Sequence, residues 1–174
     1  YDKAVFELLL SEVQIKVRGF TSQDISITLN AMSKLKHYDK AVFEVLLSEV
    51  PRKARDFGAQ QISITLNAMS NLKHYDKIVF EVLLSETQLK ARDFNPQNIV
   101  NTMNAMSNLN HYDKAVIQLL LSEAPRKIRD FNSQELANML NSMWKLQLYD
   151  TAVVEVLLSE VQRKARDFNA QDIA

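Results

Sequence analysis

The sequence predicts an all-α protein, a right-handed α-solenoid of tandem two-helix repeats. Five tyrosines at 37-residue intervals each open a near-copy of one motif, and the first two copies differ at only nine of 37 positions. Apolar residues in each copy follow the helical period and not the alternation of a strand. Only two glycines and three prolines occur among 174 residues, too few for the many turns of an all-β fold.

We expect a single array over residues 1–174. Its units start at Tyr1, Tyr38, Tyr75, Tyr112 and Tyr149, and they span residues 1–37, 38–74, 75–111, 112–148 and, in part, 149–174. The first unit opens on the second helix of the motif and the last breaks off within the first helix. We therefore interpret the chain as a fragment of a longer array.

Composition excludes several classes of function. The chain has no cysteine, which excludes disulfide scaffolds, cysteine-based zinc sites and cysteine catalysis. Two glycines leave no phosphate-cradling loop. No stretch approaches 18 apolar residues, and no secretory signal pattern is present at the N-terminus.

The first helix of the motif, helix A, is predicted over residues 22–36 and their counterparts. Asn95 is an N-cap followed by Pro96 at the first helical position, where its missing N–H costs nothing. Phe20 and Ile25 form a hydrophobic staple around the start of this helix. The N-cap position in the other copies is occupied by Thr21, Gly58, Asn132 and Asn169.

The second helix, helix B, is predicted to start after the N-caps Asp2 and Asp39, with Tyr38 and Phe43 as its staple. A proline inside a helix costs about 3 kcal/mol. Pro51 and Pro125 therefore predict that helix B ends or kinks near residues 48–50, followed by a short helical turn.

Helix A has two contrasting faces. Ile25, Leu29, Met32 and Leu35 lie on one arc, which we assign to the core, whereas helix B is apolar over most of its circumference. Helix A is therefore expected to form the concave surface. Its opposite arc, which we call the amide row, comprises Gln23, Ile27, Asn30 and Lys34, then Gln60, Ile64, Asn67 and Asn71, then Gln97, Asn101, Asn104 and Asn108, and then Gln134, Asn138, Asn141 and Lys145.

The amide row suits the recognition of nucleobases. Asparagine and glutamine offer a donor and an acceptor side by side, as base edges do. Helical repeats can bind single-stranded RNA at one base per repeat with two or three side chains. The two residues at the positions of Ile27 and Lys34 differ from copy to copy, and each of the four copies carries a different pair. Such variation is typical of modular recognition. The alternative is a set of solvated positions that drift neutrally.

A basic edge runs beside the amide row in the sequence. It comprises Lys16, Arg18, Lys53, Arg55, Lys90, Arg92, Lys127, Arg129, Lys164 and Arg166, which are candidate phosphate ligands. Although Lys+Arg and Asp+Glu both total 21, residues 14–37 of each unit carry a basic surplus. The alternative is a salt-bridged rim, because an aspartate follows most of these arginines: Asp56, Asp93, Asp130 and Asp167.

Other residues offer weaker chemistry. His37, His74 and His111 are interpreted as turn residues, because neighbouring repeats are too far apart for two imidazoles to share a metal. The methionine column at Met32, Met69, Met106 and Met143 is assigned to the core. Trp144 either packs at a repeat interface, which we favour, or stacks on a base. No catalytic set converges, so we expect neither an enzyme nor a cofactor.

The phrases FTSQDISITLNAMSKLKHYD and FNPQNIVNTMNAMSNLNHYD resemble the heptatricopeptide repeat, a relative of the octotricopeptide repeat found in FAST-kinase-like and RAP-domain proteins. The resemblance implies an α-solenoid that binds single-stranded RNA and acts on organellar or bacterial transcripts, with the base-facing residues on helix A. Asn30 stands where many members have tryptophan, and no RAP domain is present.

These observations together predict modular single-stranded RNA binding at about one nucleotide per repeat, without membrane or metal partners. The alternative is a scaffold for an extended peptide or partner protein on the same concave face, and a third possibility is a structural spacer. An organelle and a bacterial cytoplasm fit the sequence equally well.

Overall fold

In the computed structural model, residues 3–36 and 38–167 are described, and their regular structure is entirely helical. Five helices form one layer: α1 (Lys3–Lys16), α3 (Lys40–Lys53), α5 (Lys77–Lys90), α7 (Lys114–Glu123) and α9 (Thr151–Arg163). Four form the other: α2 (Ser22–Lys34), α4 (Ala59–Asn71), α6 (Pro96–Asn108) and α8 (Ser133–Lys145). Short 3-10 helices follow the first set: η1 (Val17–Gly19), η2 (Ala54–Asp56), η3 (Ala91–Asp93), η4 (Pro125–Asp130) and η5 (Ala165–Asp167).

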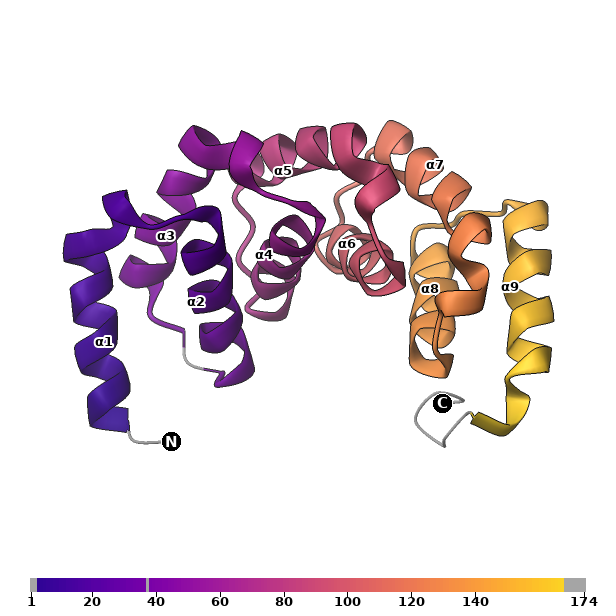
Figure 1. The fold of residues 1–174 in the computed structure, drawn as a ribbon, viewed down its shortest axis with the longest axis horizontal. Helices are drawn as coiled ribbons and strands as arrows, with labels where there is room; N and C mark the ends of the chain where they lie inside the picture. The colour runs from indigo at the N-terminus through magenta and orange to yellow at the C-terminus, as the bar shows by residue number, and fades with distance from the viewer. Residues whose placement is uncertain (1–2, 37, 168–174) are drawn as a thin grey trace.

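The two layers form an arc with α2, α4, α6 and α8 on its inner side and the other α-helices on its outer side (Figure 1). The inner helices begin at residues 22, 59, 96 and 133, each 37 residues after the previous one. Each packs against the next, α2 on α4, α4 on α6 and α6 on α8. The all-α helical-repeat fold is confirmed, whereas the handedness of the superhelix stays a prediction. No described helix is long and apolar enough to cross a membrane.

Side-chain caps start most of the helices where the sequence predicts them. Thr21 and Asn95 cap α2 and α6 in capping boxes, whereas Gly58 offers α4 no side-chain bond. The outer helices α3, α5, α7 and α9 begin after aspartates whose carboxylates accept from a backbone N–H three residues later, as Asp39 does from Val42. The predicted caps Asp2 and Asn169 lie outside the described residues.

The inner helices end slightly earlier than predicted. The first was predicted to end at residue 36 and ends at Lys34, and the others end at the equivalent residue. Lys36 and Lys73 adopt left-handed φ values of 52° and 53°, which terminate α2 and α4. The His74 N–H then donates to the Met69 carbonyl oxygen at 2.9 Å, closing the last turn. Because a lysine stands where glycine is usual, the sequence carries no marker for this ending.

The two internal prolines have different effects. The prediction that helix B ends near residues 48–50 is wrong for the first, whereas a kink there stays a prediction. α3 continues through Pro51 to Lys53, because the proline lies in the last helical turn and removes a single backbone donor. α7 ends at Glu123, and Pro125 opens the longer 3-10 helix η4.

The core lies between the layers. Ile25, Leu29 and Met32 of α2 have no exposed surface, and the methionine column is buried along its whole length. Leu35 is only half-buried, in contrast to its predicted place in the core. Small side chains such as Ala68 lie between neighbouring inner helices, whereas leucine and phenylalanine fill the outer layer. Neighbouring inner helices therefore pack more closely than neighbouring outer helices, and this difference curves the array.

Candidate nucleic-acid interface

The amide row lies on the inner helices, and none of its side chains is buried. The other sides of each inner helix contact the outer layer or the neighbouring inner helices. The row is therefore left on the inside of the arc (Figure 1). Gln23, Gln60 and Gln97 are exposed, whereas Asn30 and Asn67 are half-buried. The structure thus places all four repeats of the row on a single surface.

The last position of the row connects neighbouring repeats from the second repeat onward. Asn71 Nδ2 donates to Ser33 Oγ at 3.2 Å, and Asn108 Nδ2 donates to Ser70 Oγ at the same distance. Lys145 Nζ donates to Asn108 Oδ1 at 3.3 Å. Asn108 therefore has both its donor and its acceptor engaged by protein.

Most other amides of the row make no hydrogen bond with any described residue. These residues are exposed or half-buried, so their donors and acceptors remain available to a ligand, in contrast to those of Asn108. Asn104 differs, because its Oδ1 accepts from Ser142 Oγ. The unbonded amides are Gln23, Asn30, Gln60, Asn67, Gln97, Asn101, Gln134, Asn138 and Asn141.

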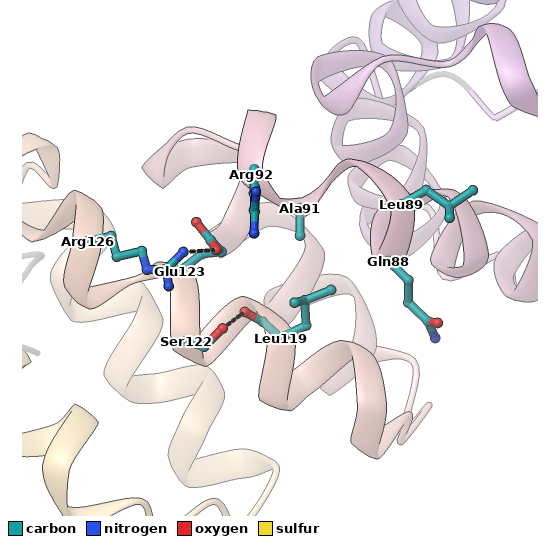
Figure 2. A pocket seen from close by; sticks show the side chains of 8 residues that line it. All are labelled: Gln88, Leu89, Ala91, Arg92, Leu119, Ser122, Glu123 and Arg126. Carbon is teal, nitrogen blue, oxygen red and sulfur yellow. Dashed lines mark hydrogen bonds and ion pairs between the residues drawn. The ribbon is translucent and has the colours of Figure 1, made fainter.

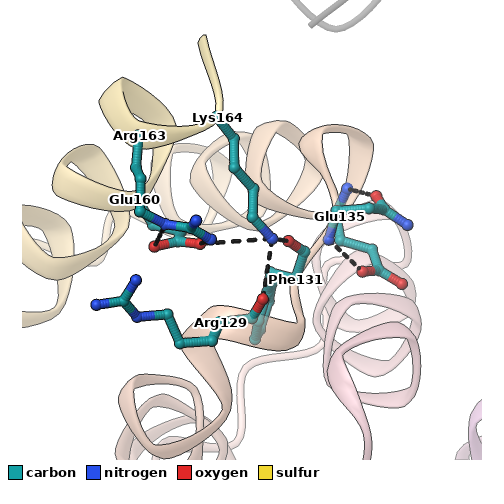
Figure 3. A network of polar contacts seen from close by, with 7 residues as sticks. Arg129, Phe131, Glu135, Glu160, Arg163 and Lys164 are labelled. Atoms are coloured by element: carbon teal, nitrogen blue, oxygen red, sulfur yellow. Dashed lines mark hydrogen bonds and ion pairs between the residues drawn. The ribbon is translucent and has the colours of Figure 1, made fainter. Parts of the chain in front are cut away.

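The lysines of the basic edge are held inside the protein from the second repeat onward. Lys90 Nζ pairs with the carboxylate of Glu86 at 2.8 Å and donates to the carbonyl oxygens of Arg55 and Phe57, each at 2.8 Å. Figure 3 shows the last such arrangement, in which Lys164 lies between Glu160 and the preceding repeat. We call these contacts the lysine–glutamate pairs: Lys53–Glu49, Lys90–Glu86, Lys127–Glu123 and Lys164–Glu160.

These pairs change the expected role of the lysines. The Lys53 and Lys90 side chains are only 22% and 24% exposed, and each ammonium already has partners in the preceding repeat. Lys16, in contrast, is 67% exposed and pairs with Glu12. The acid partner is a glutamate four residues before each lysine, and not the aspartate that follows the arginine. That i,i+4 spacing is visible in every copy and is the signal that the sequence reasoning missed.

The pairs also lower carboxyl pKa values. The hydrogen bond from Lys127 holds the pKa of Glu123 below its usual range, against the opposing effect of burial. The hydrogen bonds and charge of Arg163, helped by Lys164, lower the pKa of Glu160 to about 2. Both carboxylates are therefore charged at neutral pH, despite their burial.

The arginines of the basic edge lie beside the outer helices. Arg92 lines a groove of about 480 Å³ between α5 and α7, together with Gln88, Ser122 and Arg126 (Figure 2). Arg129 lines the equivalent groove beside α9. All of the arginines in the set are exposed. The structure thus separates the arginines from the amide row, although they are close to it in the sequence.

The histidines serve the turns between helices. Tyr38 Oη lies 2.7 Å from Nδ1 of His74, whose ring also packs on Phe43, and Tyr75 repeats the contact with His111. His37 lies outside the described residues. No group of histidine and acidic residues within the described ranges could hold a metal ion.

Trp144 is 73% exposed among the described residues. It stands in the column of Ser33 and Ser70, which are buried where the next inner helix follows. The next inner helix after α8 would begin among residues 168–174, which lie outside the described residues, so the packing of Trp144 at a repeat interface stays a prediction.

Comparison with known proteins gives the family. No curated protein matches the chain. A family model described as protein of unknown function DUF1601 matches residues 155–174. The model of the RNA-editing substrate-binding complex 6 protein matches residues 1–151, which is most of the chain. The heptatricopeptide resemblance stays a prediction. The chain belongs to the RNA-editing substrate-binding complex 6 protein family, an RNA-associated family of helical proteins.

Proposed function

We propose that this chain binds single-stranded RNA along the inside of its arc, as a recognition module without catalytic activity. The observation that carries the proposal is the set of unbonded amides in the amide row. Accessible donors and acceptors at a regular spacing can bond successive base edges. The family supports the same class of ligand, because its name describes an RNA-editing substrate-binding complex.

Base contacts in this proposal come from the first three positions of the row. From the second repeat onward the last position is engaged between repeats, as the bonds from Asn71 and Asn108 illustrate. The variable position that remains carries Ile27, Ile64, Asn101 and Asn138. Repeats three and four therefore offer more hydrogen-bonding groups than repeats one and two, and we expect them to be more selective among bases. Each repeat is expected to bind about one nucleotide.

Phosphate contacts are assigned to the exposed lysines at the ends of the inner helices. Lys34 and Lys36 line an open pocket with Asn71 on the inner layer, and Lys73 occupies the corresponding place one repeat later. The ammonium groups of the lysine–glutamate pairs are already bonded. The exposed arginines contact RNA in this proposal only if the strand extends over the edge of the array.

The test is fluorescence anisotropy of labelled single-stranded RNA pools and matched DNA at two salt concentrations. We expect saturable binding that prefers RNA and weakens as salt rises. The variant with Asn67→Ala and Asn104→Ala should bind more weakly. The control Gln88→Ala removes an exposed amide from the outer helix α5 and should bind like the unchanged chain.

Two results contradict the proposal. One is the absence of RNA binding at low salt, which leaves an extended peptide as the alternative ligand of the same face. The other is equal loss of binding in the Gln88 control, which would place the RNA outside the arc.

A further inference from the structure

Four tyrosines follow the ends of the inner helices at 37-residue intervals, and the proposed function does not use them. We call this surface the tyrosine edge: Tyr38, Tyr75, Tyr112 and Tyr149. Their exposed fractions are 43%, 45%, 59% and 81%, so each leaves a large part of its side chain in solvent. Each tyrosine stands directly before the N-cap aspartate of an outer helix. The edge is therefore a repeated, accessible aromatic surface where the inner layer connects to the outer one.

Two of these rings are fixed by the repeat that follows. The hydroxyl of Tyr38 is hydrogen-bonded to Nδ1 of His74 at 2.7 Å, and that of Tyr75 is bonded to Nδ1 of His111 at 2.9 Å. The Tyr38 ring also packs at an angle of 62° against the buried Phe43, with ring centroids 5.7 Å apart. A ring that is already held in this way loses little conformational entropy when a ligand packs on its exposed part.

Unpaired positive charge accompanies the two fixed rings. Lys36 and Lys73 stand two residues before Tyr38 and Tyr75, and both lysines are exposed and make no ion pair with a described residue. Lys36 also lines an open pocket with Asn71, the last position of the amide row in the second repeat. This pocket connects the end of the amide row to the segment that carries the first fixed ring.

We propose that the tyrosine edge is a second part of the RNA-binding surface, on which Tyr38 and Tyr75 stack against bases that continue beyond the amide row. Every base has a flat face, so an aromatic ring beside positive charge binds single strands of any sequence. A proline-rich peptide also packs on exposed aromatic rings, but the unpaired lysines favour an anionic ligand. The inference rests on the proposed RNA binding and adds affinity to it without specificity.

The test compares two substitutions of Tyr75 by the anisotropy of labelled RNA. Tyr75→Leu keeps an apolar side chain against Phe80 but removes the flat ring, and it should weaken binding about tenfold, the value of one stacked base. Tyr75→Phe keeps the ring and loses only the bond to His111, so its affinity should stay within about threefold of that of the unchanged chain. Circular dichroism checks that both variants fold.

A matched control lies three residues further along the chain. Ile78 is 67% exposed in the first turn of α5, and the other copies have alanine at this position. Ile78→Ala therefore removes an exposed apolar side chain that is not part of the tyrosine edge, and it should bind RNA like the unchanged chain.

A second measurement needs no variant. Ultraviolet crosslinking of the unchanged chain to RNA, followed by mass spectrometry of the crosslinked peptides, should identify Tyr38 or Tyr75, because each ring lies against a base in the proposed complex. This measurement decides the matter by itself if Tyr75→Leu does not fold.

The outcomes separate the two levels of the proposal. If the unchanged chain binds no RNA, the proposed function fails and this inference with it. If RNA binds but Tyr75→Leu retains full affinity, or Tyr75→Phe loses as much as Tyr75→Leu, RNA binding stands and stacking at the tyrosine edge is overturned. Crosslinks confined to the inner helices overturn it as well and leave a peptide as the alternative ligand of the edge.

Discussion

The amide row and the lysine–glutamate pairs are both polar, and both repeat every 37 residues, yet their chemistry differs. In the pairs, each ammonium donates to the preceding repeat, and Glu86 is buried beside Lys90. In the row, most amides have no described partner and remain accessible. Paired groups hold neighbouring repeats together, whereas unpaired groups are available to a ligand. Repetition of a polar residue therefore does not by itself indicate a binding site.

The largest expected effect is a loss of stability when the buried side of the inner helix α4 is truncated. Leu66 is completely buried next in sequence to Asn67 of the row. Leu66→Ala should lower the free energy of unfolding by about 2–5 kcal/mol, because it leaves a cavity between the layers. Urea denaturation followed by circular dichroism measures the loss. A neutral result would place this side of α4 outside the core.

The next effect tests whether the buried pairs hold the repeats together. Glu86→Ala leaves the Lys90 ammonium without its carboxylate partner and should cost about 1.5–3 kcal/mol, the value of hydrogen bonds to charged groups. The control is Glu81→Ala, whose carboxylate is 53% exposed and pairs with Lys77 at 3.7 Å. It should cost under about 1 kcal/mol. Equal losses would show that burial of Glu86 adds nothing to its contribution.

Acid should weaken the same pairs. The folded pKa of Glu160, about 2, lies below the ordinary value of 4.5, so the carboxylate stabilises the fold above pH 4.5. That contribution is lost as the pH falls toward 2. Melting temperature measured across this range should fall more steeply for the unchanged chain than for Glu160→Gln. Parallel curves would assign acid unfolding to other groups.

The smallest effect on stability is expected in the amide row. Asn67→Ala should change the free energy of unfolding by only about 0.5 kcal/mol, as substitutions of accessible residues usually do. Asn104→Ala also removes the bond to Ser142 and should cost about 1 kcal/mol. RNA affinity should fall in the variant that combines the two substitutions. A large loss of stability would mean that these amides support the fold, and the contrast with the lysine–glutamate pairs would disappear.

A final variant refines the amide row without disturbing its stability. Asn101→Ile gives the third repeat the side chain that Ile64 already supplies in the second. It should change base preference at one nucleotide of a selected RNA, measured with single-nucleotide variants. A uniform loss for all RNAs would instead indicate that the position contributes affinity and not specificity.

The sequence by itself determined the repeat, the helical layers and the surface on which the amides lie. Its 37-residue period and its caps are local signals, and the spacing of Ile25, Leu29 and Met32 predicted the buried side of α2 correctly. Local signals suffice here because each repeat contacts mainly its neighbours.

Only the tertiary structure decided which polar groups are free. Lys90 bonds carbonyl oxygens 33 and 35 residues earlier, and Asn71 bonds a serine 38 residues earlier. Such contacts depend on how closely two repeats approach and at what rotation, which no single repeat encodes. In the sequence, the lysines predicted to bind phosphate and the asparagines predicted to bind bases are both polar residues that recur every 37 residues. The structure distinguishes them, because the lysines have partners across the repeat boundary and most of the asparagines do not.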